Sequence, residues 1–227
     1  MDHVLPPPAT PTLPVAGSDA RFPVRRIFCV GRNYAEHAIE MGADTREPPF
    51  FFTKPADAVV TADAAIAWPM ATDDLHHEAE LVVAIGKPGR AVDPAAARDL
   101  IWGFAPGNDL TRRDLQAQAK AMRRPWDMSK GFDQSAPIGT LVPVAVCGPM
   151  ERGRISCTVD GEIRQQGDLA DMIWDVANII SALSGLVALE PGDLIMTGTP
   201  AGVGPIRPGQ TVRVEIEGLG AVETRIG

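Results

Sequence analysis

The stretch His76-His77-Glu78-Ala79-Glu80-Leu81-Val82-Val83-Ala84-Ile85-Gly86 places two carboxylates at the head of an apolar run. Residues 81–85 are all aliphatic, which favours a buried β-strand. Side chains two positions apart point to the same face of a strand, so we expect Glu78 and Glu80 to project together. Because like charges at that spacing repel, the pattern predicts either a cation bound between them or an edge strand that presents them to water.

A third acid follows another apolar stretch. Asp109 stands in Gly107-Asn108-Asp109-Leu110-Thr111, shortly after residues 100–104. Hard divalent cations prefer carboxylate oxygens, and no Cys or His cluster of zinc spacing lies nearby. Glu78, Glu80 and Asp109 are therefore candidate ligands for Mg²⁺, with Mn²⁺ as the alternative ion.

The composition predicts a soluble globular protein. With 227 residues, 45% of them hydrophobic, the chain can bury a sizeable core in one compact domain or two small ones. The net charge of −8, from acids spread along the chain, argues against a nucleic-acid or anionic-membrane partner. An anionic substrate would then need a local cationic pocket. The 3 cysteines are odd in number and far apart, which predicts free thiols and a cytoplasmic location.

The N-terminal segment is rich in proline. Prolines interrupt residues 1–15 at five positions, so this segment has no apolar signal core, and no later run reaches membrane-spanning length. We expect residues 1–21 to form an extended arm and residues 22–227 to form the folded domain.

Glycine and proline separate many short elements. Strands are expected at residues 24–30, 50–53, 78–85, 101–104, 155–159, 194–197 and 212–216. Asp160-Gly161 is a two-residue hairpin signal, and Gly218-Leu219-Gly220 is expected to close a final hairpin. Helices are expected at residues 34–41, 94–99, 112–122 and 174–183, with Thr111 and Gly185 as terminal signals for the last two. Because strands and helices do not alternate regularly, the pattern predicts an α+β fold with few short helices.

The predicted helix at residues 34–41 contains a candidate base. Asn33 and Glu36 stand at capping-box spacing before it. His37 and Glu40 are three residues apart, so they share a helical face and can hydrogen-bond. A carboxylate that holds one imidazole nitrogen leaves the other free to deprotonate water. A surface ion pair is the alternative interpretation.

Three further segments carry candidate ligand-binding groups. Arg113 and Gln116 share one face of the predicted helix after Asp109, where an arginine fork suits a carboxylate. Lys130 precedes a glycine, which lets the backbone approach a ligand closely. The glycine-rich residues 197–205 could bind an oxyanion through backbone N–H groups and the Thr199 hydroxyl, or could be a plain turn.

Together these segments resemble the fumarylacetoacetate hydrolase family, from about Arg21 to the end of the chain. The motifs that carry the resemblance are Gly31-Arg32-Asn33-Tyr34 with His37, Lys54-Pro55, Glu78-x-Glu80-Leu81, Asn108-Asp109-x-Thr111-x-Arg113-Asp114-Leu115-Gln116, Lys130-Gly131-Phe132-Asp133 and Thr197-Gly198-Thr199-Pro200-x-Gly202-Val203-Gly204. Residues 46–59 and the proline-rich arm look most similar to the bacterial fumarylpyruvate hydrolases of that family. The resemblance implies a mixed β-sheet roll for residues 22–227 and a homodimer.

The resemblance also implies roles for individual residues. Glu78, Glu80 and Asp109 match metal ligands, and His37 with Glu40 matches a dyad that activates water. Arg113, Gln116, Lys130 and Thr199 match positions that hold a pyruvoyl group, and Lys130 is also a candidate to stabilise an oxyanion. A dicarboxylic substrate needs a second cation at its far end, for which Arg32 and Arg124 are candidates.

The implied reaction is hydrolysis of a carbon–carbon bond in an acylpyruvate, giving fumarate and pyruvate from fumarylpyruvate in gentisate-type aromatic degradation. An oxaloacetate decarboxylase, or a related enol-acid isomerase or decarboxylase, could use the same metal site. A non-catalytic dicarboxylate-binding protein is an alternative of another class. An enzyme with Cys29 as its nucleophile is a further one.

Overall fold

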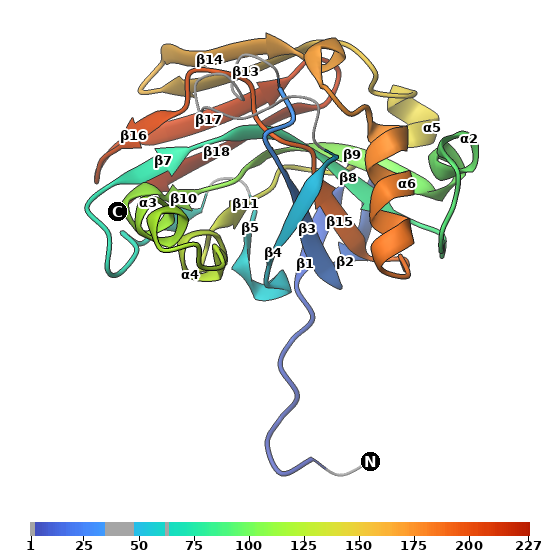
Figure 1. Ribbon diagram of the computed structural model, residues 1–227, viewed down its shortest axis with the longest axis horizontal. Helices are drawn as coiled ribbons and strands as arrows, with labels where there is room; N and C mark the ends of the chain where they lie inside the picture. Colours follow the sequence, from blue (N-terminus) through green and yellow to red (C-terminus); the bar gives the residue numbers. More distant parts are fainter. Residues whose placement is uncertain (1–2, 35–47, 62–63) are drawn as a thin grey trace.

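The computed structural model describes residues 3–34, 48–61 and 64–227. Two sheets form the body, with the five-stranded sheet above the six-stranded one in Figure 1. In spatial order the six-stranded sheet contains β12 (Val142–Pro143), β9 (Ile101–Asn108), β8 (Ala79–Ile85), β15 (Asp193–Met196), β3 (Arg26–Gly31) and β4 (Phe50–Lys54). The five-stranded sheet contains β14 (Glu162–Asp168), β13 (Arg154–Val159), β17 (Thr211–Ile216), β18 (Gly220–Ile226) and β6 (Ala65–Ile66).

Smaller sheets and short helices complete the fold. One sheet pairs β10 (Thr111–Arg112), β7 (Leu75–His77) and β16 (Gly204–Ile206), and two others pair β11 (Ala136–Pro137) with β5 (Val59–Val60) and β1 (Thr12–Val15) with β2 (Ser18–Pro23). The α-helices are α2 (Pro94–Ala97), α3 (Arg113–Ala121), α4 (Asp127–Lys130), α5 (Val144–Cys147) and α6 (Val176–Leu186), and the 3-10 helices are η1 (Ala56–Ala58), η2 (Arg98–Leu100) and η3 (Leu169–Asp171). Mixed sheets with few short helices confirm the predicted α+β class.

Strand β8 is central to the molecule because both of its faces are covered. Leu81, Val83 and Ile85 pack in the larger core, which residues of the five-stranded sheet also enter. Val82 and Ala84 pack in a second core on the opposite face. Each such aliphatic side chain contributes about 1.5–3 kcal/mol when fully buried. The apolar run therefore lies between neighbours β9 and β15, and the alternative of a wet edge strand is wrong.

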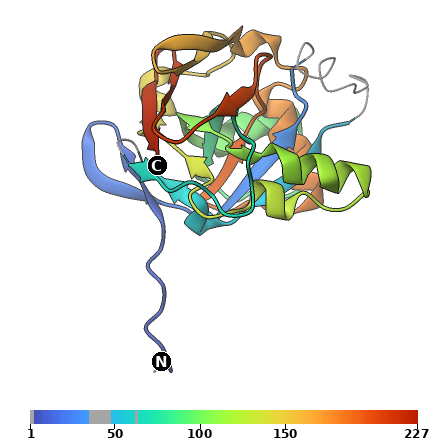
Figure 2. The ribbon, with the colours of Figure 1, turned by 90° about the vertical axis from the view of Figure 1, so that its left-hand side faces the viewer.

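The predicted N-terminal arm contains a hairpin. Strands β1 and β2 pair antiparallel, and Leu13 and Phe22 are buried in the second core. A turn at Gly17, with φ of 72°, joins the strands. Residues 3–10, which precede β1, run away from the body as an irregular segment, as Figures 1 and 2 both show. Residues 12–23 are therefore paired strands that pack on the body, and the division of the chain into an arm and a folded domain stays a prediction.

Both predicted hairpins are confirmed. Asp160 and Gly161 join β13 to β14 with positive φ angles of 51° and 82°. Gly218 and Gly220 flank the turn between β17 and β18.

Two helix-end predictions are wrong. Thr111 lies in β10 and its hydroxyl donates to the carbonyl of Asp109, so it does not cap α3, which begins at Arg113. Helix α6 continues to Leu186, and Gly185 lies inside it without the positive φ of a helix-ending glycine. None of the helices within the described residues is long and apolar enough to cross a membrane.

The cysteines are free. Cys29 and Cys157 are buried and Cys147 is half-buried. Burial raises the pKa of the Cys29 thiol well above its usual value, and the nearby charge of Asp109 adds to this effect. A thiolate nucleophile at Cys29 is therefore disfavoured.

Candidate active site

Glu78, Glu80 and Asp109 meet in the interior. Glu78 lies between β7 and β8, Glu80 lies in β8, and Asp109 directly follows β9. One carboxylate oxygen from each lies within 4.8 Å of the other two. The residues are 5%, 1% and 0% exposed, respectively. The acids that the sequence singled out are thus one buried cluster.

Backbone bonds hold this cluster together. The Asp109 N–H donates to the Glu78 carbonyl over 2.9 Å. The Asn108 side-chain oxygen accepts from the Glu78 N–H, also over 2.9 Å. These two hydrogen bonds join the start of β8 to the end of β9. They therefore keep the three carboxylates close together although their charges repel.

Three cations neutralise part of the cluster. Lys54 Nζ lies 2.8 Å from Asp109 Oδ1, and Lys130 Nζ lies 2.6 Å from Asp109 Oδ2 and 2.8 Å from Glu78 Oε2. Arg113 pairs with the other oxygen of Glu78. Burial alone would lower the pKa of Lys130, but the charges of Asp109 and Glu78 outweigh it and raise that pKa. Lys130 is thus held as a cation beside the acids.

Glu80 differs from its two neighbours. Its Oε2 accepts a 2.7 Å hydrogen bond from the Gly198 N–H, and it forms no ion pair with any described residue. Burial raises its pKa well above the usual value, and the charges of Asp109 and Glu78 raise it further. A buried carboxylate is costly unless a cation compensates it. Three carboxylates that supply only oxygen donors and require a compensating cation fit Mg²⁺ or Mn²⁺.

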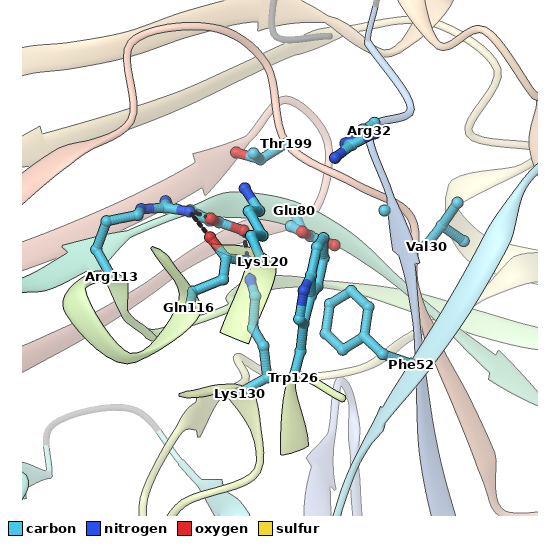
Figure 3. A pocket seen from close by; sticks show the side chains of 12 residues that line it. Val30, Arg32, Phe52, Glu80, Arg113, Gln116, Lys120, Trp126, Lys130 and Thr199 are labelled. Atoms are coloured by element: carbon cyan, nitrogen blue, oxygen red, sulfur yellow. Dashed lines mark hydrogen bonds and ion pairs between the residues drawn. The ribbon is translucent and has the colours of Figure 1, made fainter. Parts of the chain in front are cut away.

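Helix α3 presents one face to the cavity beside the acids. Arg113, Gln116 and Lys120, spaced at i, i+3 and i+7, all line that cavity. Arg113 donates to Gln116 Oε1 over 2.6 Å and to His76 Nδ1 over 3.3 Å, in addition to its bond to Glu78. The structure thus brings the predicted Arg113 and Gln116 together at the acidic centre (Figure 3).

The glycine-rich loop supplies one hydroxyl to the cavity. Gly198 has a φ of +96°, and a Cβ there would lie 2.7 Å from the Cβ of Asn33, so glycine is required. Its N–H donates a hydrogen bond to Glu80 and is therefore not free to bind a substrate oxyanion. Thr199 lines the cavity, and its Oγ1 accepts from Gln165 Nε2 over 2.8 Å. The Thr199 hydroxyl hydrogen is therefore left to donate to a ligand.

Asn33 connects two loops, and its predicted role as a cap with Glu36 stays a prediction because residues 35–47 lie outside the described residues. Its Oδ1 accepts from the Trp174 N–H, and its Nδ2 donates to the carbonyls of Trp174 and Thr197. The side chain is fully buried. It fixes the glycine-rich loop from the side opposite to β8.

The predicted Arg32 also lines the cavity, whereas Arg124 does not. Arg32 adopts a left-handed conformation, with φ of 60°, and its guanidinium lies 5.7 Å from the centre of the Phe50 ring. Arg124 is exposed and borders a separate surface hollow formed with residues 50–53. Of the two candidates for a second cation, only Arg32 is placed to meet a ligand.

His37 and Glu40 lie outside the described residues, so their predicted role as a dyad stays a prediction. Three residues of the site have no role predicted from the sequence: Lys54, Lys120 and Gln165. Helical spacing from Arg113 could have found Lys120. No local pattern could have found Gln165, which reaches the site from the other sheet.

Fold and site together define a class of protein, a mixed β-sheet roll around a buried carboxylate centre. Residues 26–227 match the family described as "Fumarylacetoacetate (FAA) hydrolase C-terminal". The chain belongs to this family of enzymes, as its motifs predicted.

Relatives in the family have several activities. The structure of fumarylpyruvate hydrolase from Pseudomonas aeruginosa in complex with Mn²⁺ and pyruvate is 50% identical, covers 99% of both chains and superposes with a TM-score of 0.97. Mitochondrial oxaloacetate decarboxylase from Dictyostelium discoideum is 43% identical over 86% of this chain and 90% of its own length. Human mitochondrial oxaloacetate tautomerase FAHD1 is 40% identical over 86% and 88%, respectively.

Proposed function

We propose that this protein hydrolyses a carbon–carbon bond in an acylpyruvate, with fumarylpyruvate as the substrate and fumarate and pyruvate as the products. The observation that carries the proposal is the buried triad of Glu78, Glu80 and Asp109, in which Glu80 lacks a described cationic partner. The Pseudomonas aeruginosa relative, whose structure holds Mn²⁺ and pyruvate, supports both the metal and the pyruvoyl group. A place in gentisate-type aromatic degradation follows from that substrate.

The reaction adds water across one bond. A hydroxide adds to the acyl carbonyl carbon, which becomes the new carboxylate of fumarate. The electron pair of the broken carbon–carbon bond passes to the methylene carbon of the pyruvoyl group, which takes up a proton and leaves as pyruvate. A divalent ion held by Glu78, Glu80 and Asp109 would supply Lewis acidity where negative charge develops on the pyruvoyl oxygens.

The remaining residues bind and orient the substrate. Gln116 and the Thr199 hydroxyl face the cavity and donate hydrogen bonds to the pyruvoyl carboxylate and ketone. Arg113 and Lys130 keep the acids in place and add positive charge beside the same group. Because these donors are fixed by their neighbours, they stabilise developing charge without reorganising.

A general base must generate the hydroxide. We assign this role to His37, oriented by Glu40, as the sequence predicts. Base assistance of this kind is typically worth about 10² to 10⁴ in rate. We also assign to Lys130, which lines the cavity beside the acids, the stabilisation of the oxyanion formed at the acyl carbon.

Enolisation or decarboxylation of oxaloacetate is a second candidate function. The relatives from Dictyostelium discoideum and human, named for those activities, favour it. Both reactions also place negative charge on a pyruvoyl oxygen, so the same triad would serve. They need no hydroxide, which is the chemical difference from the hydrolase.

A parallel kinetic comparison separates the two. Purified protein loaded with Mn²⁺ is given fumarylpyruvate and oxaloacetate in separate assays, and kcat/KM is measured for each. We expect fumarylpyruvate to be preferred by a large factor and its turnover to stop with EDTA. A preference for oxaloacetate would replace the hydrolase proposal with the second candidate. The homodimer and the cytoplasmic location stay predictions.

A further inference from the structure

Two cations in the cavity have no carboxylate partner among the residues that the structure describes. Lys120 and Arg32 both line it, yet neither forms an ion pair or a hydrogen bond through its side chain with any described residue. The Arg32 Nε is buried and unpartnered. The other cations of the site, Lys54, Lys130 and Arg113, are all bound to Asp109 or Glu78. Lys120 and Arg32 are thus the cationic groups in the described site that remain available to a ligand.

An aromatic cluster of Phe50, Phe52 and Trp126 holds these two groups. The Lys120 amine lies 5.1 Å from the centre of the Trp126 ring, and the Arg32 guanidinium lies 5.7 Å from that of Phe50. Trp126 packs edge-on against Phe50, with the ring centres 5.2 Å apart. Contacts between a cation and an aromatic face orient the cation but leave its N–H groups free.

The positions of the groups suit the far end of an extended ligand. Lys120 is seven residues after Arg113 on α3, which corresponds to about 10 Å along the helix. In Figure 3 the Lys120 amine and the Arg32 side chain extend toward Thr199, on the side away from Lys130. A ligand whose pyruvoyl group lies at the acids would place its other end beside Lys120 and Arg32.

The two cations also repel each other. The pKa of Lys120 is lowered to about 8 by burial and by the charges of Arg113 and Arg32. An anion bound between Lys120 and Arg32 would relieve this repulsion, since it would add a negative charge to that of Glu78, which already raises the pKa of Lys120.

We propose that Lys120 and Arg32 form a second anion subsite, which binds the carboxylate at the acyl end of a dicarboxylic acylpyruvate. The inference rests on the proposed function, because it takes the pyruvoyl end to lie at the acids. It makes Lys120 a specificity-determining residue. Acylpyruvates with an uncharged acyl group are bound only through their pyruvoyl end.

The test compares two substrates that differ at the acyl end. Fumarylpyruvate carries the second carboxylate and acetylpyruvate does not. We expect Lys120→Met to lower kcat/KM for fumarylpyruvate by about 10- to 100-fold, the range for losing a hydrogen bond to a charged group, and to change acetylpyruvate turnover little. Lys120→Arg should restore most of the loss because it keeps the charge. Arg124→Gln, which removes a nearby charge outside the cavity, should change neither substrate.

A second variant keeps the test independent of Lys120. Arg32→Asn removes the guanidinium, and asparagine tolerates the left-handed φ at this position. It should shift the ratio of the two substrates in the same direction as Lys120→Met. Equal losses for both substrates, or no loss for fumarylpyruvate, in both variants would overturn the subsite.

Failure of the proposed function can be distinguished from failure of the subsite. If the wild type hydrolyses neither acylpyruvate, both are compared as ligands of the Mn²⁺-loaded protein by isothermal titration calorimetry. Tighter binding of fumarylpyruvate that is lost in Lys120→Met supports the subsite, and equal affinities overturn it.

Discussion

Gln165 donates to Thr199 Oγ1 over 2.8 Å, across the space between the five-stranded sheet and the glycine-rich loop. Its Nε2 also donates to the Pro200 carbonyl, and its Oε1 accepts from His77 Nδ1 and from the Ala79 N–H. Gln165 is 1% exposed. One buried amide thereby fixes the Thr199 hydroxyl that faces the cavity and the start of β8.

Gln165→Leu should therefore impair both stability and activity. The substitution leaves the Ala79 N–H and the His77 ring nitrogen without their acceptor in the interior, which costs about 1–3 kcal/mol each. We expect a lower free energy of unfolding in urea and a fall in kcat/KM of about tenfold as Thr199 loses its orientation. Thr199→Val, which loses the hydroxyl alone, should reproduce the kinetic loss at normal stability. An unchanged kcat/KM in Gln165→Leu would contradict the positioning role.

Glu80→Gln should separate metal binding from folding. Glutamine keeps an oxygen for the Gly198 N–H but removes the charge that Asp109 and Glu78 oppose. We expect the metal-free variant to melt at or above the temperature of the metal-free wild type, because like-charge repulsion is relieved. Mn²⁺ should raise the melting temperature of the wild type and leave that of the variant unchanged. Equal stabilisation of the two proteins by Mn²⁺ would exclude Glu80 as a ligand.

The pH dependence of KM should report on Lys120. Its pKa of about 8 means that the amine is charged below this pH and loses its charge as pH rises through it. KM for fumarylpyruvate should therefore increase between pH 7 and 9. KM for acetylpyruvate should not show this increase. Burial lowers this pKa most, the charges of Arg113, Arg32 and Lys130 lower it further, and the charge of Glu78 raises it. In Lys120→Arg the increase should disappear, because arginine stays charged throughout.

His37→Ala should reduce kcat by about 10² to 10⁴, the range for loss of a general base. Pyruvate inhibition should keep its wild-type constant, because the pyruvoyl end is bound by other residues. Glu40→Gln should have a smaller effect of the same kind. A rise in KM without loss of kcat would show that His37 binds substrate and does not activate water.

The parts of the fold that could be predicted are those in which local sequence and packing agree. The run at residues 81–85 is aliphatic because both faces of β8 are covered, so its length and composition identified a strand. Asp160-Gly161 gave the hairpin because both residues adopt positive φ there. Thr111 was predicted to begin a helix, but it pairs with β7 as part of β10. Gly185 was predicted to end a helix, but the hydrogen-bonded turns of α6 continue past it.

The site divides in the same way. The triad could be predicted because Glu78 and Glu80 are near in sequence and Asp109 ends the adjacent strand. Lys54 and Gln165 could not be, since the residues that they contact in the site, Asp109 and Thr199, respectively, lie far from them along the chain. A buried lysine or glutamine has no local pattern that distinguishes it from an exposed one.

The most direct test of the central claim is a proton NMR assay of fumarylpyruvate with protein stripped of metal by EDTA, before and after Mn²⁺ is restored. We predict no turnover before the addition, and fumarate and pyruvate in equal amounts after it. Products other than these, or the same rate without metal, would contradict metal-dependent hydrolysis at Glu78, Glu80 and Asp109.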